Sequence, residues 1–299
     1  MRDLARLARL DVALNFLYLG TCWALILLSV WLFAVERSWL TFALAFLVVS
    51  SRQQALLNVE HDCIHNHFVP GRRWNERVGI VMAASPCGSP FYASRARHLA
   101  HHRLLASAED PDARLHTSDD KRTAGGVLRY FALGLVGGYA ATVMFEPEAV
   151  AVEPSLRRRD RRNVLLAQAV LVVVFTLLFG WWAYPLLWLV PVYVFTYLAD
   201  NFRAWVEHSH PEEDAAADRH RLITFLSSPV ERMLFAPMNM NYHAVHHLWP
   251  SIPYYHLPAA DREIRTQAQT LGLEWRGSYL SYLVRYWLAL PIASCRRQA

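Results

Sequence analysis

Two long stretches without a charged residue constrain this 299-residue chain more than any other feature. Residues 12–35 and residues 164–199 contain no Asp, Glu, Lys or Arg. A helix of about 20 apolar residues crosses the hydrocarbon core of a bilayer, so each stretch is long enough to span one. Only 18% of all residues are charged, whereas soluble domains average about a quarter. We therefore expect an integral membrane protein.

The apolar runs divide naturally into pairs. Glu36 and Arg37 form a tight polar turn between the first run and a second one. Gly180 and Pro185 interrupt the later run near its middle, as these residues interrupt helices generally. We expect four transmembrane helices in two hairpins, at about residues 12–35, 38–59, 164–180 and 183–199.

Two shorter apolar segments, residues 78–94 and 130–145, contain helix breakers. The first includes Pro86 and Gly88, and the second includes Gly137 and Gly138. Because they are short and interrupted, we expect interfacial or re-entrant helices, although two further spans are the alternative. The whole chain, residues 1–299, is predicted to form one domain.

The basic residues indicate how the chain is oriented. The net charge is +5 and Lys121 is the only lysine. Arginines precede the first span and cluster at residues 157–162, which predicts cytoplasmic termini and polar regions. Arginines that flank apolar segments, instead of an aromatic-lined face, argue against nucleic acid as a partner. The preference for Arg, with abundant Ala and Leu, is typical of a GC-rich bacterium, so we expect the bacterial cell membrane.

Fourteen histidines gather in groups rather than being scattered. His61 and His65 are four residues apart and would share one face of a helix. Two further segments have the form HxxHH, in which the first histidine shares a helical face with either of the other two. These segments supply His98, His101 and His102, and His243, His246 and His247.

Such spacing predicts a metal site at the cytoplasmic boundary of the membrane. Each adjacent pair in the HxxHH segments points in two directions, which suits two neighbouring ions. Imidazole binds zinc, copper, iron and nickel, so the ligand type alone does not name the metal. With this site, the predicted fold class is all-α: four spans, interfacial or re-entrant helices, and a cytoplasmic helical cap that carries the metal.

The order of these segments resembles the three histidine boxes of the membrane fatty acid desaturase superfamily. HDCIH, HLAHH and HAVHH follow one another between apolar hairpins. The acidic segment Glu109–Asp112, the pair Asn241-Tyr242 and the segment Pro250–Pro258 also resemble their counterparts in bacterial acyl desaturases. The resemblance extends over about residues 40 to 260.

The resemblance implies a centre of two non-haem irons that uses O2. A further ligand between the second and third boxes would be His208, giving nine candidates with the eight histidines above. Asp62 and Glu207 adjoin candidate ligands, so we expect them to hydrogen-bond the outer ring nitrogens. His67 and His210 do not share a helical face with the boxes, and His116, His220 and His256 are expected to face solvent.

Three functions are compatible with these motifs. The first is the desaturation of a fatty acyl chain, and the second is hydroxylation or ketone formation on a lipid or carotenoid at the same centre. The third, a metal transporter or sensor, predicts polar groups inside the spans, and the uncharged runs do not supply them. The sequence contains no His-Pro-Gly-Gly haem signature and no GxGxxG, so we expect an external, ferredoxin-like electron donor.

Overall fold

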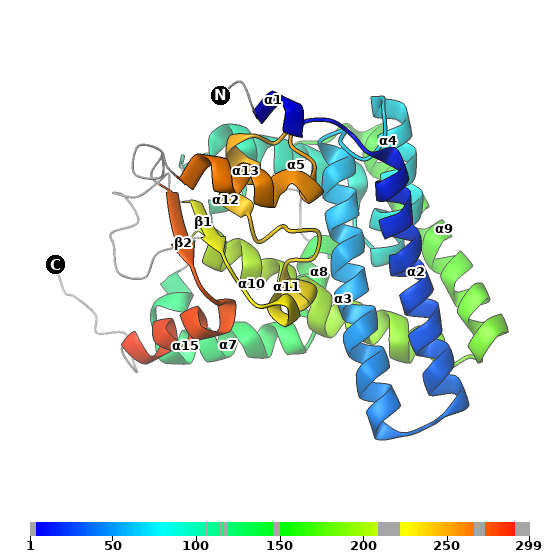
Figure 1. Ribbon diagram of the computed structural model, residues 1–299. Helices are drawn as coiled ribbons and strands as arrows, with labels where there is room; N and C mark the ends of the chain where they lie inside the picture. Colours follow the sequence, from blue (N-terminus) through cyan, green and yellow to red (C-terminus); the bar gives the residue numbers. More distant parts are fainter. Residues whose placement is uncertain are drawn as a thin grey trace.

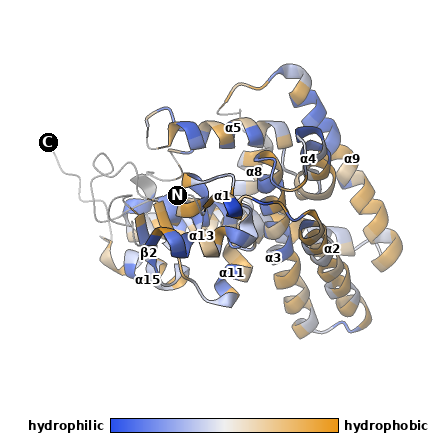
Figure 2. Ribbon diagram, turned by 45° about the horizontal axis from the view of Figure 1, so that its top comes forward, coloured by the Kyte–Doolittle hydropathy of each residue, from blue (hydrophilic) through white to orange (hydrophobic). Residues whose placement is uncertain are grey.

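The structure is a computed structural model in which long apolar helices stand beside a compact group of shorter elements. It describes residues 4–105, 107–113, 115, 119–145, 150–208, 222–265 and 273–290. Figure 1 shows helices α2, α3 and α9, with the short helix α4, along one side, and most of the other short helices with a small sheet on the other. Colouring by hydropathy shows the same division, since α2, the later part of α9 and the far end of α3 are the most apolar ribbons (Figure 2).

The first hairpin confirms the predicted turn. Helix α2 (Val12–Val35) ends at Glu36, and helix α3 (Trp39–Ile64) begins after Ser38. The Ser38 hydroxyl accepts a hydrogen bond from the backbone N–H of Thr41, and the Thr41 hydroxyl accepts one from the N–H of Ser38. This capping box satisfies backbone donors that would otherwise lie unpaired at the helix start. Helix α3 extends five residues past the predicted boundary at residue 59 and so carries the first histidines.

Helix α9 (Pro154–Phe179) is the third helix long and apolar enough to span a membrane. It begins ten residues before the predicted start at residue 164, so that the arginine cluster forms its first turns. Leucines on its apolar part are largely exposed, for example Leu177 at 80%. Side chains of this kind fit a lipid environment and not an aqueous one.

The predicted fourth span has a different form from the other three. Residues 183–208 are helical throughout, but they include two π-helical segments, η4 (Pro185–Leu189) and η5 (Val192–Thr196), before helix α10 (Tyr197–His208). Pro185 and Pro191 lack the N–H that a regular ladder needs, which accounts for irregular winding here. In the described part of the chain, three helices meet the criteria for a span, and the four-span arrangement stays a prediction.

The segment at residues 78–94 is broken, as its proline and glycine predict. Helix α4 (Arg72–Gly79) passes into a π-helical turn, η1 (Ile80–Ala84), and a 3-10 turn, η2 (Ser85–Cys87), and helix α5 (Phe91–Leu104) follows. The Gln168 side-chain amide donates to the carbonyls of Ser85 and Pro86 at 2.8 Å. These bonds from α9 satisfy the backbone acceptors of the break where water is excluded.

The second interrupted segment forms two helices, α7 (Ala124–Leu135) and α8 (Gly138–Phe145), which follow the 3-10 turn η3 (Asp119–Arg122). The break falls at Gly137, whose φ of 81° lies in the left-handed region that glycine adopts without strain. The close approach of the Tyr193 ring also leaves little room for a side chain there.

A group of short elements covers the histidines, and one of its features corrects the all-α prediction. Strands β1 (Leu222–Phe225) and β2 (Leu273–Arg276) pair in parallel, with Leu222 opposite Leu273. The Leu-Ile-Thr-Phe sequence of β1 suits a strand, and all four residues are buried. The remaining elements are α1 (Leu4–Leu7), α11 (Pro229–Phe235), α12 (His243–Leu248), η6 (Tyr254–His256), α13 (Leu257–Ile264) and α15 (Tyr279–Ala289).

Candidate metal centre

Four segments from distant parts of the chain bring the candidate histidines together. They are the last turn of α3 with its C-cap residue, the second half of α5, the end of α10, and helix α12. Local contacts fix each of them. The turn before α12 holds Met238 and Asn239 at positive φ, and the Asn58 side-chain amide of α3 donates to the carbonyl of Pro237 in that turn at 2.8 Å.

Helix α5 obtains its N-terminal cap from another helix. Its own preceding residue, Pro90, provides no side-chain cap. The Asp160 carboxylate on α9 instead accepts hydrogen bonds from the backbone N–H groups of Tyr92 and Ala93, all at 3.1 Å. A carboxylate at a helix N-terminus satisfies free donors and complements the helix dipole. The third apolar helix thereby positions the helix that carries three candidate ligands.

Five of the histidines form one group, called here the five-histidine group. One ring nitrogen from each lies within 4.8 Å of the others. The Nε2 atoms of His98 and His65 are 2.8 Å apart, and those of His98 and His102 are 3.0 Å apart. The members are His61, His65, His98, His102 and His246.

The other four form a second group, the four-histidine group. Nitrogens of three of them lie within 4.8 Å of one another. The fourth, His243, joins them through its Nε2, which is 2.7 Å from Nε2 of His208 and 2.9 Å from Nε2 of His247. The members are His101, His208, His243 and His247.

The two groups lie side by side. The rings of His102 and His247, one from each group, stack with centroids 4.2 Å apart. The structure thus brings all nine predicted histidines together and divides them five to four. Adjacent residues in each HxxHH segment contribute to different groups: His101 and His102 separate, as do His246 and His247.

Burial keeps several of the imidazoles in the neutral state that metal binding requires. Burial lowers the pKa of His98, His243, His246 and His247 well below the ordinary histidine value, and it lowers the pKa of His102 to about 4. These rings are neutral near pH 7 and can offer a lone pair. The buried Nε2 of His61 has no hydrogen-bond partner. Polar atoms buried without partners are rare, and a metal ion would satisfy this one.

Carboxylates lie against the outer nitrogens of both groups, but unequally. In the four-histidine group, Glu207 places Oε2 3.3 Å from Nδ1 of His243. In the five-histidine group, Asp62 places Oδ1 3.5 Å from Nδ1 of His61. Both acids lie beside the rings that the sequence predicts, but the predicted hydrogen bonds are not formed, since Nδ1 of His61 and Nδ1 of His243 have no hydrogen-bond partner.

One carboxylate in this role escaped the sequence analysis. Asp110 accepts a hydrogen bond from Nδ1 of His101, with its two oxygens at 2.9 and 3.1 Å. Asp110 belongs to the acidic segment after the second box, which was noted only as part of the family resemblance. Its position in that segment was the available signal, but its partner lies nine residues away across a turn, a relation that helical spacing does not reveal.

Glu207 also belongs to a buried network behind the four-histidine group. The hydroxyl of Tyr279 on α15 donates to Oε1 of Glu207 at 2.6 Å, and Nε of Arg203 lies 3.3 Å from Oε2. Burial raises the pKa of Glu207 to about 8, while the Arg203 charge and the tyrosine hydroxyl act in the opposite direction. Arg203 donates in turn to Oδ1 of Asn58 at 3.2 Å, which ties the network to α3.

The remaining histidines stand apart from the two groups where the structure describes them. The His67 ring stacks on His65 with centroids 6.0 Å apart but belongs to neither group. His256 is half-buried in η6 and not in an open loop, with its ring 4.7 Å from that of Tyr255. His116, His210 and His220 lie outside the described residues.

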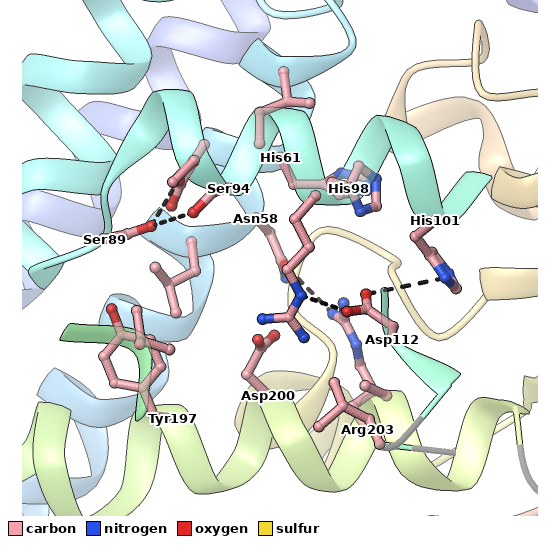
Figure 3. A pocket seen from close by; sticks show the side chains of 18 of the residues that line it. Asn58, His61, Ser89, Ser94, His98, His101, Asp112, Tyr197, Asp200 and Arg203 are labelled. Atoms are coloured by element: carbon pink, nitrogen blue, oxygen red, sulfur yellow. Dashed lines mark hydrogen bonds and ion pairs between the residues drawn. The ribbon is translucent and has the colours of Figure 1, made fainter. Parts of the chain in front are cut away.

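A cavity of about 250 Å³ opens beside the histidines. Candidate ligands of both groups line it, including His61, His98 and His208. Figure 3 shows Ser89 and Ser94 on one side of this space, and Tyr197, Asp200 and Arg203 on α10 opposite them. A molecule in the cavity would therefore contact both histidine groups.

Comparison with known proteins is consistent with this centre. The family model for fatty acid desaturases matches residues 37–279, which is most of the chain and includes all nine histidines. The chain belongs to the fatty acid desaturase family. The family assignment agrees with the resemblance found in the histidine segments, and members with known activities are oxidoreductases.

Relatives within this family have more than one activity. A beta-carotene ketolase from a Paracoccus species (strain N81106) is 28% identical over 75% of this chain and 79% of its own length. A dihydrorhizobitoxine desaturase from Bradyrhizobium elkanii is 26% identical over 77% of this chain and 69% of its own. An sn-1 acyl-lipid omega-3 desaturase (ferredoxin) from a Nostoc species is 25% identical over 76% and 68%.

Proposed function

We propose that this protein is a membrane-bound, O2-dependent di-iron desaturase that introduces a double bond into a fatty acyl chain. The observation that carries the proposal is the division of nine histidines into two adjacent groups. A single ion would not use nine imidazoles, whereas two ions with four or five nitrogens each would. Membership of the desaturase family supports the same class of reaction.

The residues fit a pair of irons. The five-histidine group would hold one ion and the four-histidine group the other, with Asp62, Asp110 and Glu207 fixing the ring orientations from outside. Neutral imidazoles leave two ferrous ions uncompensated, and nearby cations favour ionised carboxyl groups, so these acids would also balance charge once iron is bound. When bound, the iron pair supplies the activation of O2 that cleavage of an unactivated C–H bond requires.

The protein itself would position the reacting carbon and exclude water. The cavity beside the histidines lies where a C–H bond must be held, and it is lined by ligands of both groups. The buried network of Tyr279, Glu207 and Arg203 holds Glu207 against the ring of His243. Precise positioning by supporting contacts of this kind is what such a centre needs from its protein.

Two electrons per turnover would come from a separate carrier. A ferredoxin-like donor is supported by the name of the Nostoc relative and by the basic start of α9. We place the chain in the bacterial inner membrane with the termini and histidines on the cytoplasmic side, where such a donor is found. A reporter that is active only in the periplasm, fused after Ala299, should give no signal.

A second activity at the same centre is hydroxylation or ketone formation, and the similarity to a beta-carotene ketolase favours it specifically. Mass spectrometry of lipids from an expressing host distinguishes the two. Relative to its substrate, a desaturated product has two hydrogens fewer, a hydroxylated product has one oxygen more, and a ketone has one oxygen more and two hydrogens fewer. Lipids that all carry the added oxygen would replace the desaturase proposal with the oxygenase one.

A further inference from the structure

Helix α15 has a buried face and an exposed face, and the exposed face is apolar. Three tyrosines, Tyr279, Tyr282 and Tyr286, lie buried along the first. On the second, Leu288 is 70% exposed. The exposed apolar residues follow helical spacing and are Leu280, Val284, Trp287 and Leu288. A surface helix normally turns polar side chains outward, so this apolar stripe indicates a contact that the protein does not itself make.

Polar side chains border the stripe along one edge. Ser281 and Arg285 are exposed there, and Nε of Arg285 donates to the carbonyl of Ser281 at 3.3 Å. An apolar stripe with an arginine at its edge is typical of a helix that lies in the plane of a membrane surface. The long arginine side chain can then reach the lipid headgroups while the apolar residues enter the acyl region.

The apolar surface continues onto the two helices that hold α15. At the start of α15, the backbone N–H of Leu280 donates to Oε1 of Glu231 on α11 at 3.0 Å. Near its end, the indole N–H of Trp287 donates to the carbonyl of Ala124 on α7 at 3.1 Å. Both neighbours expose apolar side chains as well, namely Val230 and Met233 on α11 and Leu128, Leu133 and Leu135 on α7. An exposed apolar surface that extends over three helices marks a contact with a partner or a membrane.

The connection to α3 identifies the bilayer as that contact. The Ser51 hydroxyl on α3 donates to the carbonyl of Met233 on α11 at 2.6 Å. Leu47, one helical turn earlier on the same face of α3, is exposed, so the lipid-facing surface of this helix passes directly onto α11. Figure 1 shows α15 and α7 along the lower edge of the shorter elements, the side toward which the α2–α3 hairpin extends. A bilayer around this hairpin would therefore reach the apolar faces of all three helices.

The buried face of α15 reaches the four-histidine group. Tyr279, in the first turn of α15, donates its hydroxyl to Oε1 of Glu207, and Oε2 of Glu207 lies 3.3 Å from Nδ1 of His243. The position of α15 therefore sets the position of a hydroxyl that holds the acid beside a candidate ligand.

We infer that the exposed apolar faces of α11, α15 and α7 lie in the surface of the bilayer, and that lipid contact with α15 keeps Tyr279 against Glu207. The first part goes beyond the proposed function and does not depend on it. The second part rests on the proposed function, because it concerns the metal centre. The bilayer would then support the metal centre in addition to surrounding the spans.

Quenching of a fluorescent label tests the lipid contact. Single cysteines replace Val284, Leu288 or, as the control, Arg262, which is exposed on α13 near the upper edge of the molecule in Figure 1. Cys295 is changed to serine, and the cysteines at positions 22, 63 and 87 are buried. The full chain is placed in vesicles of phosphatidylcholine and phosphatidylglycerol. Brominated lipid should quench the labels at 284 and 288 several-fold more than the label at 262, which aqueous iodide should quench instead.

Two results of this measurement would overturn the inference. If iodide quenches the labels at 284 and 288 as strongly as the label at 262, the stripe faces water. If neither quencher reaches them, a second copy of the chain or another protein covers the stripe.

Charge substitutions on α15 test the link to the metal centre. Val284→Glu places a charge in the stripe and should lose iron to a chelator about 10-fold more readily than the wild type, since changes around metal ligands commonly cost that much or more. Ser281→Glu adds the same charge at the polar edge and should retain iron like the wild type. Leu288→Glu tests the same point if Val284→Glu does not fold.

A double variant shows whether the effect passes through Tyr279. Adding Tyr279→Phe to Val284→Glu should cause little further loss of iron, because both changes would act through one hydrogen bond. Iron retention equal to the wild type in Val284→Glu, or losses that add fully in the double variant, would overturn the link.

The two parts of the inference can fail separately from the proposed function. Quenching needs no iron, so it decides the lipid contact even if the protein contains none. Protein without iron would refute the proposed function and the link to the metal centre together. Protein that contains iron and oxidises lipids, yet has labels quenched only by iodide, would refute the inference alone.

Discussion

The two histidine groups differ in how the surrounding protein supports them. In the four-histidine group, His101 is hydrogen-bonded to Asp110, and His243 lies against Glu207, which Tyr279 holds in turn. In the five-histidine group, the one carboxylate at an outer nitrogen that the described residues show is Asp62, at 3.5 Å. The four-histidine group thus has fewer ligands and more supporting contacts, whereas the five-histidine group has more ligands and fewer supporting contacts.

This difference shows two ways to hold a metal. A group with a spare ligand can lose one ring and still surround an ion, whereas a group of four depends on each ring and on what orients it. Helix packing brings both groups together, since α3, α5 and α12 supply the five-histidine group and α5, α10 and α12 supply the four-histidine group. The four-histidine group also has buried acids against two of its rings. The predictions below test whether the two groups respond differently.

The largest effect should follow loss of a ligand from the four-histidine group. His247→Ala and His208→Ala should each lose iron and nearly all product, by more than the roughly 10–100-fold that changes around a metal site commonly cost. Insertion should be unaffected, since the apolar helices drive it. Iron content and product are compared at equal membrane expression. Full iron and turnover in His208→Ala would remove that residue from the ligand set.

Loss of a ligand from the five-histidine group should cost less. His65→Ala leaves four rings around the same ion, so we expect partial iron retention and more residual product than in His247→Ala. The same two measurements, made side by side, decide the order. The contrast between the groups fails if His65→Ala is the more damaging change.

Removing a supporting carboxylate should have a smaller effect than removing a ligand. Asp110→Asn keeps the shape of the side chain but weakens the hydrogen bond to His101. Changes of this kind typically reduce metal affinity or activity about 10–100-fold. Iron retention during titration with a chelator measures the change in metal affinity. Unchanged retention would mean that Asp110 does not support the ligand.

The smallest effect among these variants should come from Tyr279→Phe. It removes one hydroxyl that donates to Glu207, and a hydrogen bond to a charged group contributes about 1.5–3 kcal/mol. Because the hydroxyl acts on the ligand only through Glu207, activity should fall by about an order of magnitude or less. His256→Ala, in η6 and outside both groups, is the control and should retain iron and most product. A larger loss in the control than in Tyr279→Phe would undermine the distinction between ligands and bystanders.

Much of the fold followed from local sequence patterns. The bounds of α2 match the uncharged run, and the breaks near Pro86 and Gly137 fall where these residue types predict them. The long run at residues 164–199 was harder to interpret. Its prolines indicate an interruption, but the packing of the π-helical turns, such as the stacking of Trp23 on Trp188, joins residues far apart in the sequence. The pairing of β1 with β2 likewise joins strands far apart in sequence.

For the candidate site too, local sequence patterns predicted some features and only the structure showed others. Spacing within each box predicted which histidines share a helical face, and the structure brings all nine together. Their division into five and four depends on how α3, α5, α10 and α12 pack, so it required the structure. Asp62 and Glu207 adjoin candidate ligands in the sequence, and their side chains lie near the rings of His61 and His243 without the predicted hydrogen bonds. Asp110 and Tyr279 reach the site through a turn and from a distant helix, and were not.

Elemental analysis of the purified protein tests the central claim most directly. Two adjacent groups, each with enough nitrogens for one ion, predict two iron ions per chain after expression in iron-replete medium. His247→Ala measured in parallel should contain less iron than the wild type. One zinc ion per chain and no iron would contradict the di-iron account, whatever products the host accumulates.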